Sequence, residues 1–440
     1  MKYGIAKPIA ALGVLTFIVS MALPSVSAAG YDLDTASMTW IMVATALVLL
    51  MTPGIALFYA GMLRKESVMS MLGQTMMVMV VVTLIWVTLG YTLAFGPSQA
   101  GLVGGLDYLL LNNTPYGESF LVEGIPDAQF MLFQLTFALV TAALVLGAVA
   151  ERTKLKALLI FIVIWSIVVY APIAHWVWGG GWFEDYFVSL DFAGGTVVHI
   201  CSGVTALALA IVVGRRGSSI QKDRPHNLPL VFIGGALLWF GWFGFNGGSA
   251  LAADGIAVNA MVVTQISAAT AAGTWGLINY LHLGRPGVLG MVTGAVAGLV
   301  GITPAAGFVG PMEAIIIGAG AGAFCYATVA LKHKLKADDA LDVFAVHGVG
   351  GIWGALATGI LAVPAITSDA GADGVKGLIY GGYDLFFGQI ATVGVTAVYA
   401  FVISFIIIKV IAMFMDIRLD KKEEMIGQDL IEHGEAAYDI

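Results

Sequence analysis

The chain has 440 residues, of which 59% are hydrophobic and only 11% are charged, and its formal net charge is −8. A soluble domain carries about 25% charged residues, so this composition excludes an ordinary soluble protein and predicts an all-α polytopic membrane protein. No basic patch is large enough to bind nucleic acid. The 56 glycines suit such a fold, because helices in lipid associate through small residues.

The first 29 residues have the layout of a secretory signal peptide. Two lysines precede an apolar run over 9–23, and small residues follow at 25–29. We expect cleavage after Ala28 or Ala29. An uncleaved first span is the alternative, and charge bias does not separate the two, because both place the following residues outside.

Eleven apolar segments after residue 35 are long enough to cross a bilayer, and they make up a predicted transmembrane domain over 30–414. In chain order they cover 37–60, 69–95, 128–150, 155–175, 192–214, 228–250, 257–281, 287–308, 312–331, 340–362 and 386–414.

Basic residues predict the orientation of these spans. With the mature N-terminus outside, seventeen of the twenty Lys and Arg residues lie in internal loops or in the tail over 415–440. Two more lie in the leader, and only Lys376 lies outside. Positive residues favour the cytoplasmic side, so we expect the N-terminus outside and the C-terminus inside.

Two histidines, His199 and His347, lie within the fifth and tenth predicted spans. An ionisable side chain at membrane depth is costly and marks a candidate functional site, and histidine can donate or accept a proton near neutral pH. We expect their rings to be in contact or about 10 Å apart. The plain alternative for each is a satisfied interhelical hydrogen bond.

The positions of the two histidines also indicate a repeat. Each is followed by small residues at i+3 and i+4, on its own helix face. An odd number of spans with matched histidines predicts a 5+5 inverted repeat plus one further helix. Such repeats commonly place a transport site at their interface.

Aromatic and polar residues gather toward the predicted outer ends of three spans. They are Trp178 at the end of the fourth span, Gln134 and Phe137 on one face of the third, and Trp242, Phe245 and Ser249 on one face of the sixth. Interfacial anchoring and ordinary packing are the plain alternatives for such residues. Asp191, at the start of the fifth span, reads as a helix N-cap.

At these residues the chain resembles the ammonium transporter family, in the bacterial Amt branch of the Amt/Mep/Rh superfamily. The resemblance runs from about residue 35 to the end, and the string Asp-Phe-Ala-Gly-Gly-Thr-Val-Val-His over 191–199 is its most specific part. Further matching strings lie over 54–62, 133–137, 171–175, 242–249, 301–305, 342–348 and 433–438.

The resemblance implies a role for each candidate residue. Trp178, Ser249 and Phe137 would form an outer ammonium-recruitment site, with Asp191 as its support. Phe137 and Phe245 would form a stacked gate beneath it. His199 and His347 would be the paired pore histidines.

The resemblance also implies a trimer with one pore in each protomer, in the bacterial cytoplasmic (inner) membrane. The cytoplasmic tail would dock across neighbouring subunits, and a cytosolic PII-type protein would regulate the inner exits. The expected cargo is ammonium or ammonia, and we expect no enzymatic activity.

Composition and chemistry together suggest how ammonium would cross. Moving a bare ion into a low-dielectric medium costs on the order of 20 kcal/mol, whereas neutral ammonia crosses far more cheaply. We expect capture of the ion, loss of a proton, passage of ammonia and separate return of the proton. Potassium has no proton to lose, so this chemistry would exclude it.

Three rival functions remain open at this stage. The two histidines could ligate haem, although a two-haem relay needs four ligands. An electroneutral Rh-like ammonia gas channel is the closer rival, and an ammonium sensor is the third. Cys201 and Cys325 lie in different apolar segments without metal-ligand spacing, and we expect neither a metal nor another cofactor.

Overall fold

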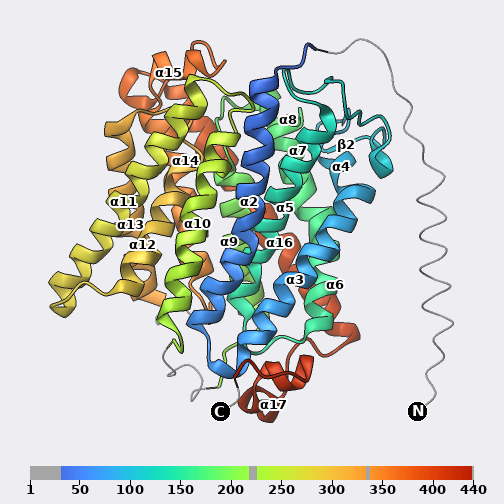
Figure 1. Ribbon diagram of the computed structural model, residues 1–440, viewed down its shortest axis with the longest axis vertical. Coiled ribbons are helices and arrows are strands. Elements are labelled where there is room, and N and C mark those ends of the chain that lie inside the picture. The colour runs from blue at the N-terminus through green and yellow to red at the C-terminus, as the bar shows by residue number, and fades with distance from the viewer. Residues whose placement is uncertain (1–30, 218–224, 333–336, 439–440) are drawn as a thin grey trace.

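The computed structural model describes residues 31–217, 225–332 and 337–438, and within them it is a bundle of long, roughly parallel helices (Figure 1). The predicted signal peptide over 1–29 lies outside the described residues. Among the described residues, ten helical segments are long and apolar enough to cross a membrane. This confirms the predicted all-α, multi-span architecture.

The first five of these segments come from the N-terminal half of the chain. They are α2 (Thr35–Met62); η1 (Lys65–Ser67) with α3 (Val68–Ile85), η2 (Trp86–Gly90) and α4 (Tyr91–Phe95); α5 (Asp127–Val149); α6 (Leu155–Trp165) with η4 (Ser166–Tyr170) and α7 (Ala171–Trp178); and η5 (Gly195–Ile200) with α9 (Cys201–Val213). The other five are α10 (Leu228–Gly248), α11 (Gly255–Leu283), α13 (Pro311–Leu331), η8 (Phe344–Gly348) with α14 (Val349–Leu361), and α16 (Tyr383–Phe414).

The predicted span over 287–308 corresponds to a shorter helix, α12 (Val288–Ile302), of 15 residues. At 1.5 Å per residue it is about 22 Å long, which is less than the ~30 Å hydrocarbon core. Pro304 follows its end, and proline cannot continue a helix, because it lacks an N–H and its ring clashes with the preceding turn. The residues after Ile302 therefore form turns within the bundle, where Ala305, Ala306 and Val309 are fully buried.

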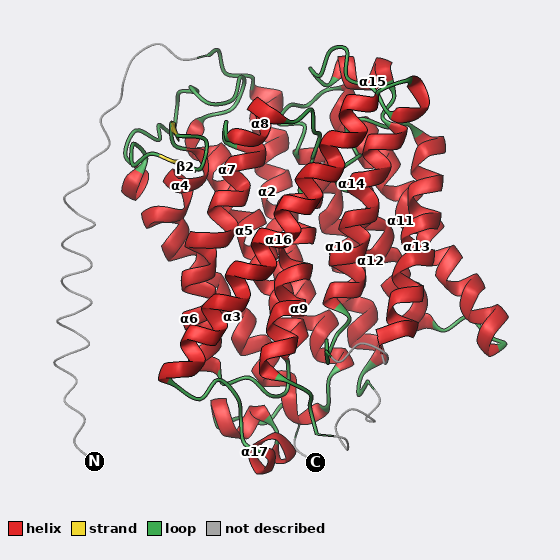
Figure 2. Cartoon of the chain, turned by 180° about the vertical axis from the view of Figure 1, so that it is seen from behind, coloured by secondary structure: helices red, strands yellow, loops and turns green. Residues whose placement is uncertain are grey.

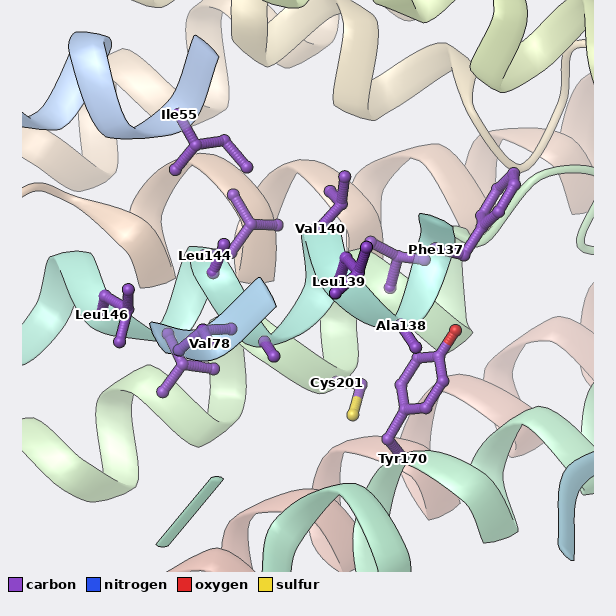
Figure 3. Close-up of a cluster of buried hydrophobic side chains, with 14 of the residues drawn as sticks. Ile55, Val78, Phe137, Ala138, Leu139, Val140, Leu144, Leu146, Tyr170 and Cys201 are labelled. Carbon is purple, nitrogen blue, oxygen red and sulfur yellow. The ribbon is translucent and has the colours of Figure 1, made fainter. Parts of the chain in front are cut away.

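The helix α5 lies at the centre of the bundle. All of its residues from Phe133 to Val149 are buried. Around it, Val78 of α3, Ile55 of α2, Cys201 of α9 and Tyr170 of η4 supply side chains to one apolar cluster (Figure 3).

Glycines bring neighbouring helices close together where α2 crosses α10. A Cβ atom at Gly234 would lie 2.3 Å from the backbone nitrogen of Phe58, and one at Gly244 would lie 2.6 Å from Cβ of Leu47. Neither position has room for a side chain. Small residues are what membrane helices use to pack, because lipid supplies no hydrophobic force between them.

Short elements cover the two ends of the bundle (Figure 2). The predicted outer end carries the hairpin of β1 (Ser98–Gln99) with β2 (Val103–Gly104), and η3 (Leu109–Leu111), α8 (Trp182–Tyr186), α15 (Pro364–Asp369) and η9 (Leu378–Tyr380). The opposite end carries α17 (Lys421–Ile426) and η10 (Asp429–His433) from the tail. The two-stranded hairpin is antiparallel, with Ser98 paired to Gly104.

Candidate transport site

The two predicted pore histidines meet inside the bundle. His199 is fully buried and His347 is 5% exposed, and their Nδ1 atoms lie 3.3 Å apart. The sequence left open whether the two rings touch or lie about 10 Å apart, and in the structure they touch. A hydrogen bond between two Nδ1 atoms needs one donor and one acceptor, so these atoms hold a single proton between them.

Glycines let the two histidine-bearing helices touch. Each histidine has a glycine four residues later, and each of these glycines packs on the other helix. A Cβ atom at Gly203 would lie 2.1 Å from the nitrogen of Gly348, and one at Gly351 would lie 3.0 Å from Cβ of His199. The glycine of each segment thus packs against the other segment. Two segments related by a two-fold axis make such reciprocal contacts, which are consistent with the predicted repeat.

Both histidines lie in π-helical turns, η5 and η8, at the start of their spans. Such turns are rare and concentrate at functional sites. A carboxylate precedes each histidine by eight residues, Asp191 for His199 and Asp339 for His347. The sequence pattern did not single out Asp339, although this equal spacing was visible in it.

Asp191 caps the fifth span, as the sequence suggests. Its carboxylate accepts the backbone N–H groups of residues 194–197 at 2.6 to 3.3 Å. Its carbonyl oxygen accepts the indole N–H of Trp178 at 2.9 Å. Gly194 has φ of +113°, a conformation that favours glycine and turns the chain into η5. Asp191 therefore both starts the helix and holds the tryptophan.

Asp339 has the matching position just ahead of the tenth span. Its carboxylate accepts the N–H of Phe344 at 2.7 Å, and its second oxygen has no partner among the described residues. Burial, together with the nearby carboxylate of Asp342, raises the pKa of Asp339 to about 6. A buried carboxyl group thus lies at the opposite end of the bundle from Asp191.

An aromatic stack connects His199 with the predicted outer end. The ring of Phe245 lies 5.9 Å from that of His199, the rings of Phe245 and Phe137 are 4.4 Å apart, and Trp178 meets Phe137 edge-on at 5.9 Å. Phe137 and Phe245 are almost fully buried. The residues predicted as gate and outer site are therefore in mutual contact.

Trp242 is a further member of this stack. The sequence analysis placed it on the same helix face as Phe245 and Ser249 but gave it no role. Its ring is stacked on His199 at 5.4 Å, and its indole N–H donates to the hydroxyl of Thr303 at 2.9 Å. Thr303 lies in the break after α12 that the sequence did not predict. This explains why sequence reasoning missed Thr303.

An outer cavity of about 550 Å³ opens above the stack. Among the residues that line it are Gln134, Phe137, Trp178, Asp191 and Ser249. The Ser249 hydroxyl donates to the carbonyl oxygen of Phe245 at 2.8 Å, which leaves its oxygen able to accept a hydrogen bond. The structure thus brings all four predicted substrate-binding residues to one cavity.

A smaller cavity of about 30 Å³ lies on the other side of the histidines. His347, Tyr59 and Asp342 are among its lining residues. Asp342 is paired with Lys332 at 2.6 Å. The aromatic stack and the histidine pair therefore lie between this inner cavity and the outer one described above.

The tail folds onto the inner loops of its own chain. Leu419 donates its N–H to the carbonyl oxygen of Arg152 at 2.9 Å, and the amide of Gln428 contacts Glu151 and Thr153. Arg152 is fully buried, and its burial lowers its pKa to about 10. Docking on neighbouring subunits stays a prediction.

The chain is similar to known proteins over most of its length. The sequence pattern of the Ammonium Transporter Family matches residues 39–438. The ammonium transporter of Bacillus subtilis is 48% identical over 393 residues, which are 89% of this chain and 96% of the relative. Ammonium transporter Amt1 of Archaeoglobus fulgidus is 45% identical over 403 residues, covering 91% of this chain and 99% of the relative.

Solved structures show the same fold. The crystal structure of Candida albicans Mep2 is 38% identical, with a TM-score of 0.84, over 92% of this chain and 90% of that chain. A structure titled Sensor Amt Protein is 28% identical, with a TM-score of 0.81, over 90% of this chain and 98% of that chain. A relative at 48% identity, aligned over nearly its whole length, shares family as well as fold. This chain therefore belongs to the ammonium transporter family.

Proposed function

We propose that this chain captures NH4+ at the outer aromatic cavity, removes one proton, conducts NH3 through the pore and returns the proton separately through His199 and His347. The observation that carries the proposal is the 3.3 Å contact between the two Nδ1 atoms beside Phe245. The Nε2 atom of His199 is buried and has no partner among the described residues. It is therefore available to accept a proton.

Capture needs groups that replace the water around the ion. A cation over the face of Trp178 or Phe137 would gain on the order of 1–2 kcal/mol once desolvated. The Ser249 oxygen can accept an N–H hydrogen bond. In this proposal Asp191 is a positioning residue, because its carbonyl oxygen holds the Trp178 indole.

The apolar residues below the outer cavity favour loss of a proton from ammonium. The buried rings of Phe245 and Trp242 pack against the buried His199 ring, and Phe137 packs against Phe245. Moving a bare cation into such surroundings costs on the order of 20 kcal/mol in the Born limit. Ammonia avoids that cost and potassium cannot, so the proposed selectivity comes from chemistry rather than from size.

Reconstituted transport tests this proposal. We expect ammonium to evoke a current in proteoliposomes and potassium to evoke none. His199→Asp and His347→Asp should admit potassium, because a carboxylate in the pore stabilises an intact cation. If the double alanine variant still carried an ammonium-specific current without a potassium leak, the histidine relay would be excluded.

The same proteoliposomes distinguish the proposed transporter from an electroneutral gas channel and from an ammonium sensor. An electroneutral gas channel would raise the internal pH of the vesicles without a current. A sensor would bind ammonium with little flux.

We also propose that the protein is a homotrimer in the bacterial inner membrane, that its leader is cleaved and that a PII-type protein binds the cytoplasmic face. Membership of the ammonium transporter family, together with the resemblance described above, supports these proposals. Native mass spectrometry of the detergent-solubilised protein tests the trimer and shows whether the leader is present.

A further inference from the structure

The outer cavity is much larger than its proposed cargo. It measures about 550 Å³, whereas an ammonium ion is similar in size to a water molecule, whose share of liquid volume is about 30 Å³. Capture of ammonium beside Trp178 and Ser249 therefore uses a small part of it. Most of the residues that line the cavity have no role in the proposed pathway.

These walls combine aromatic rings with negative charge. The aromatic residues are Phe95, Phe130, Phe137, Trp178, Phe192 and Phe308. Three carboxylates, those of Asp191, Asp254 and Asp369, line the same cavity, and the last two are exposed at its mouth. None of the described lining residues is Lys, Arg or His. The cavity thus suits a cation with an apolar surface.

The rim of the cavity is held in place before any ligand arrives. Leu121 and Val122 line it, and the carboxylate of Asp127 accepts the N–H groups of Phe120 and Leu121 at 2.9 and 3.1 Å. The amide of Gln129 donates to the carbonyl oxygen of Met38 at 2.6 Å. A preformed cavity binds without the entropic cost of ordering loops.

The rings of Phe137 and Phe245 close the floor of the cavity. The ring centroids of Phe137 and Phe245 are 4.4 Å apart, so these rings are in van der Waals contact. A cation with four methyl groups cannot pass without a large displacement of both rings. It also has no N–H proton to lose, so the proposed deprotonation cannot help it across.

We propose that the outer cavity binds small quaternary ammonium ions, of the tetramethylammonium and choline class, and that these ions block the pore from outside without being transported. Aromatic walls recognise quaternary ammonium groups through cation–π contacts, and these need no hydrogen-bond acceptor. Asp254 and Asp369 add attraction at the mouth. This proposal rests on the proposed function in one respect, because it takes ammonium transport as the activity that these ions block.

Two measurements on the full chain test it. In proteoliposomes, tetramethylammonium and choline should inhibit the ammonium-evoked current in competition with ammonium and evoke no current alone. In detergent, both ions should raise the melting temperature. The neutral isostere of choline, 3,3-dimethylbutanol, should do neither. If ammonium evokes no current, the proposed function fails, and the melting shift still decides whether the cavity binds these ions.

Two variants outside the ammonium pathway locate the binding. Phe308→Leu, and Asp254→Asn combined with Asp369→Asn, should each weaken inhibition about three- to tenfold. Their saturating ammonium currents should remain unchanged. Phe324→Leu, on the exposed face of α13, is the matched control and should leave inhibition intact. Ammonium currents that persist at 100 mM tetramethylammonium without inhibition, or equal inhibition by the neutral isostere, would overturn the proposal.

Discussion

The contact between the two Nδ1 atoms couples the states of the two rings. If Nδ1 of His199 carries the shared proton in a neutral ring, its Nε2 is an acceptor, and the Nε2 of His347 carries a proton. One tautomer therefore presents an acceptor near the aromatic stack and a donor near the inner cavity that His347 lines. In the proposed relay, transfer of one proton through the pair would reverse both, and the rings would have to reset before the next cycle.

Thr303 should matter for transport through Trp242. Replacement by Val removes the acceptor of a buried indole N–H, which costs on the order of 1–3 kcal/mol. We expect Thr303→Val to lower the ammonium current, because the ring stacked on His199 loses its anchor. Thr303→Ser keeps the hydroxyl and serves as the control. Equal currents in both variants would show that this hydrogen bond does not position the ring.

At the scale of the element, the crossing of the fifth and tenth spans sets the distance between the histidines. The added Cβ of Gly203→Ala would meet Gly348 at 2.1 Å, so the helices must separate. Overpacking of this kind costs about 1–3 kcal/mol. We expect a strong loss of transport in a protein that still assembles. Gly394→Ala, with open space around it, is the control and should transport normally.

Asp339 gives the start of the tenth span a pH dependence. Its folded-state pKa of about 6 lies above the ordinary value of 3.8, so the folded protein holds this proton more tightly than the unfolded chain does. The resulting stabilisation is complete below about pH 4 and is lost as the pH rises through 6; it amounts to at most about 3 kcal/mol.

We therefore expect Asp339→Asn to melt with a flatter pH profile than the unsubstituted protein between pH 4 and pH 6. Asn keeps a carbonyl oxygen that can accept the N–H of Phe344. Asp32→Asn, at an exposed position, should leave the profile unchanged. Parallel profiles for all three proteins would contradict the assignment.

At the scale of the whole molecule, buried charges join the inner loops to one another. Glu151 is 2% exposed and pairs with Arg64 at 3.1 Å and Arg216 at 2.7 Å. Arg216 in turn pairs with Asp338 at 2.9 Å. Segments from four inner loops therefore converge on one cluster, which also contacts the tail through Gln428.

Removing the charge of Glu151 should loosen the inner face. Breaking a buried ion pair from one side costs about 3–5 kcal/mol. We expect Glu151→Gln to lower the melting temperature and to expose the tail to limited proteolysis. Asp416→Asn, which removes an exposed pair with Lys154, should change neither. A protease-resistant tail in Glu151→Gln would show that this cluster does not hold it.

Features that depend on residues close together in the chain could be predicted from the sequence, and features that depend on distant residues could not. Ten of the eleven spans that hydropathy predicts match long helices among the described residues, because each span must satisfy its own backbone hydrogen bonds and cover about 30 Å of hydrocarbon. Hydropathy overestimated the helix after Gly287, where the Pro304 break is stabilised by contacts from elsewhere: the carbonyl oxygen of Pro304 accepts the N–H of Phe192. Spacing identified Asp191 as a cap, since a cap is a local interaction.

The sequence by itself determined the multi-span helical class, the family and the candidate pore residues, because composition, hydropathy and a nine-residue string are properties of neighbouring positions. Only the tertiary structure decided that the histidines touch, that Trp242 reaches Thr303 and that the tail lies on Glu151 and Arg152. Those contacts join residues far apart in the chain. They depend on how closely helices cross, which small residues permit and local patterns do not specify.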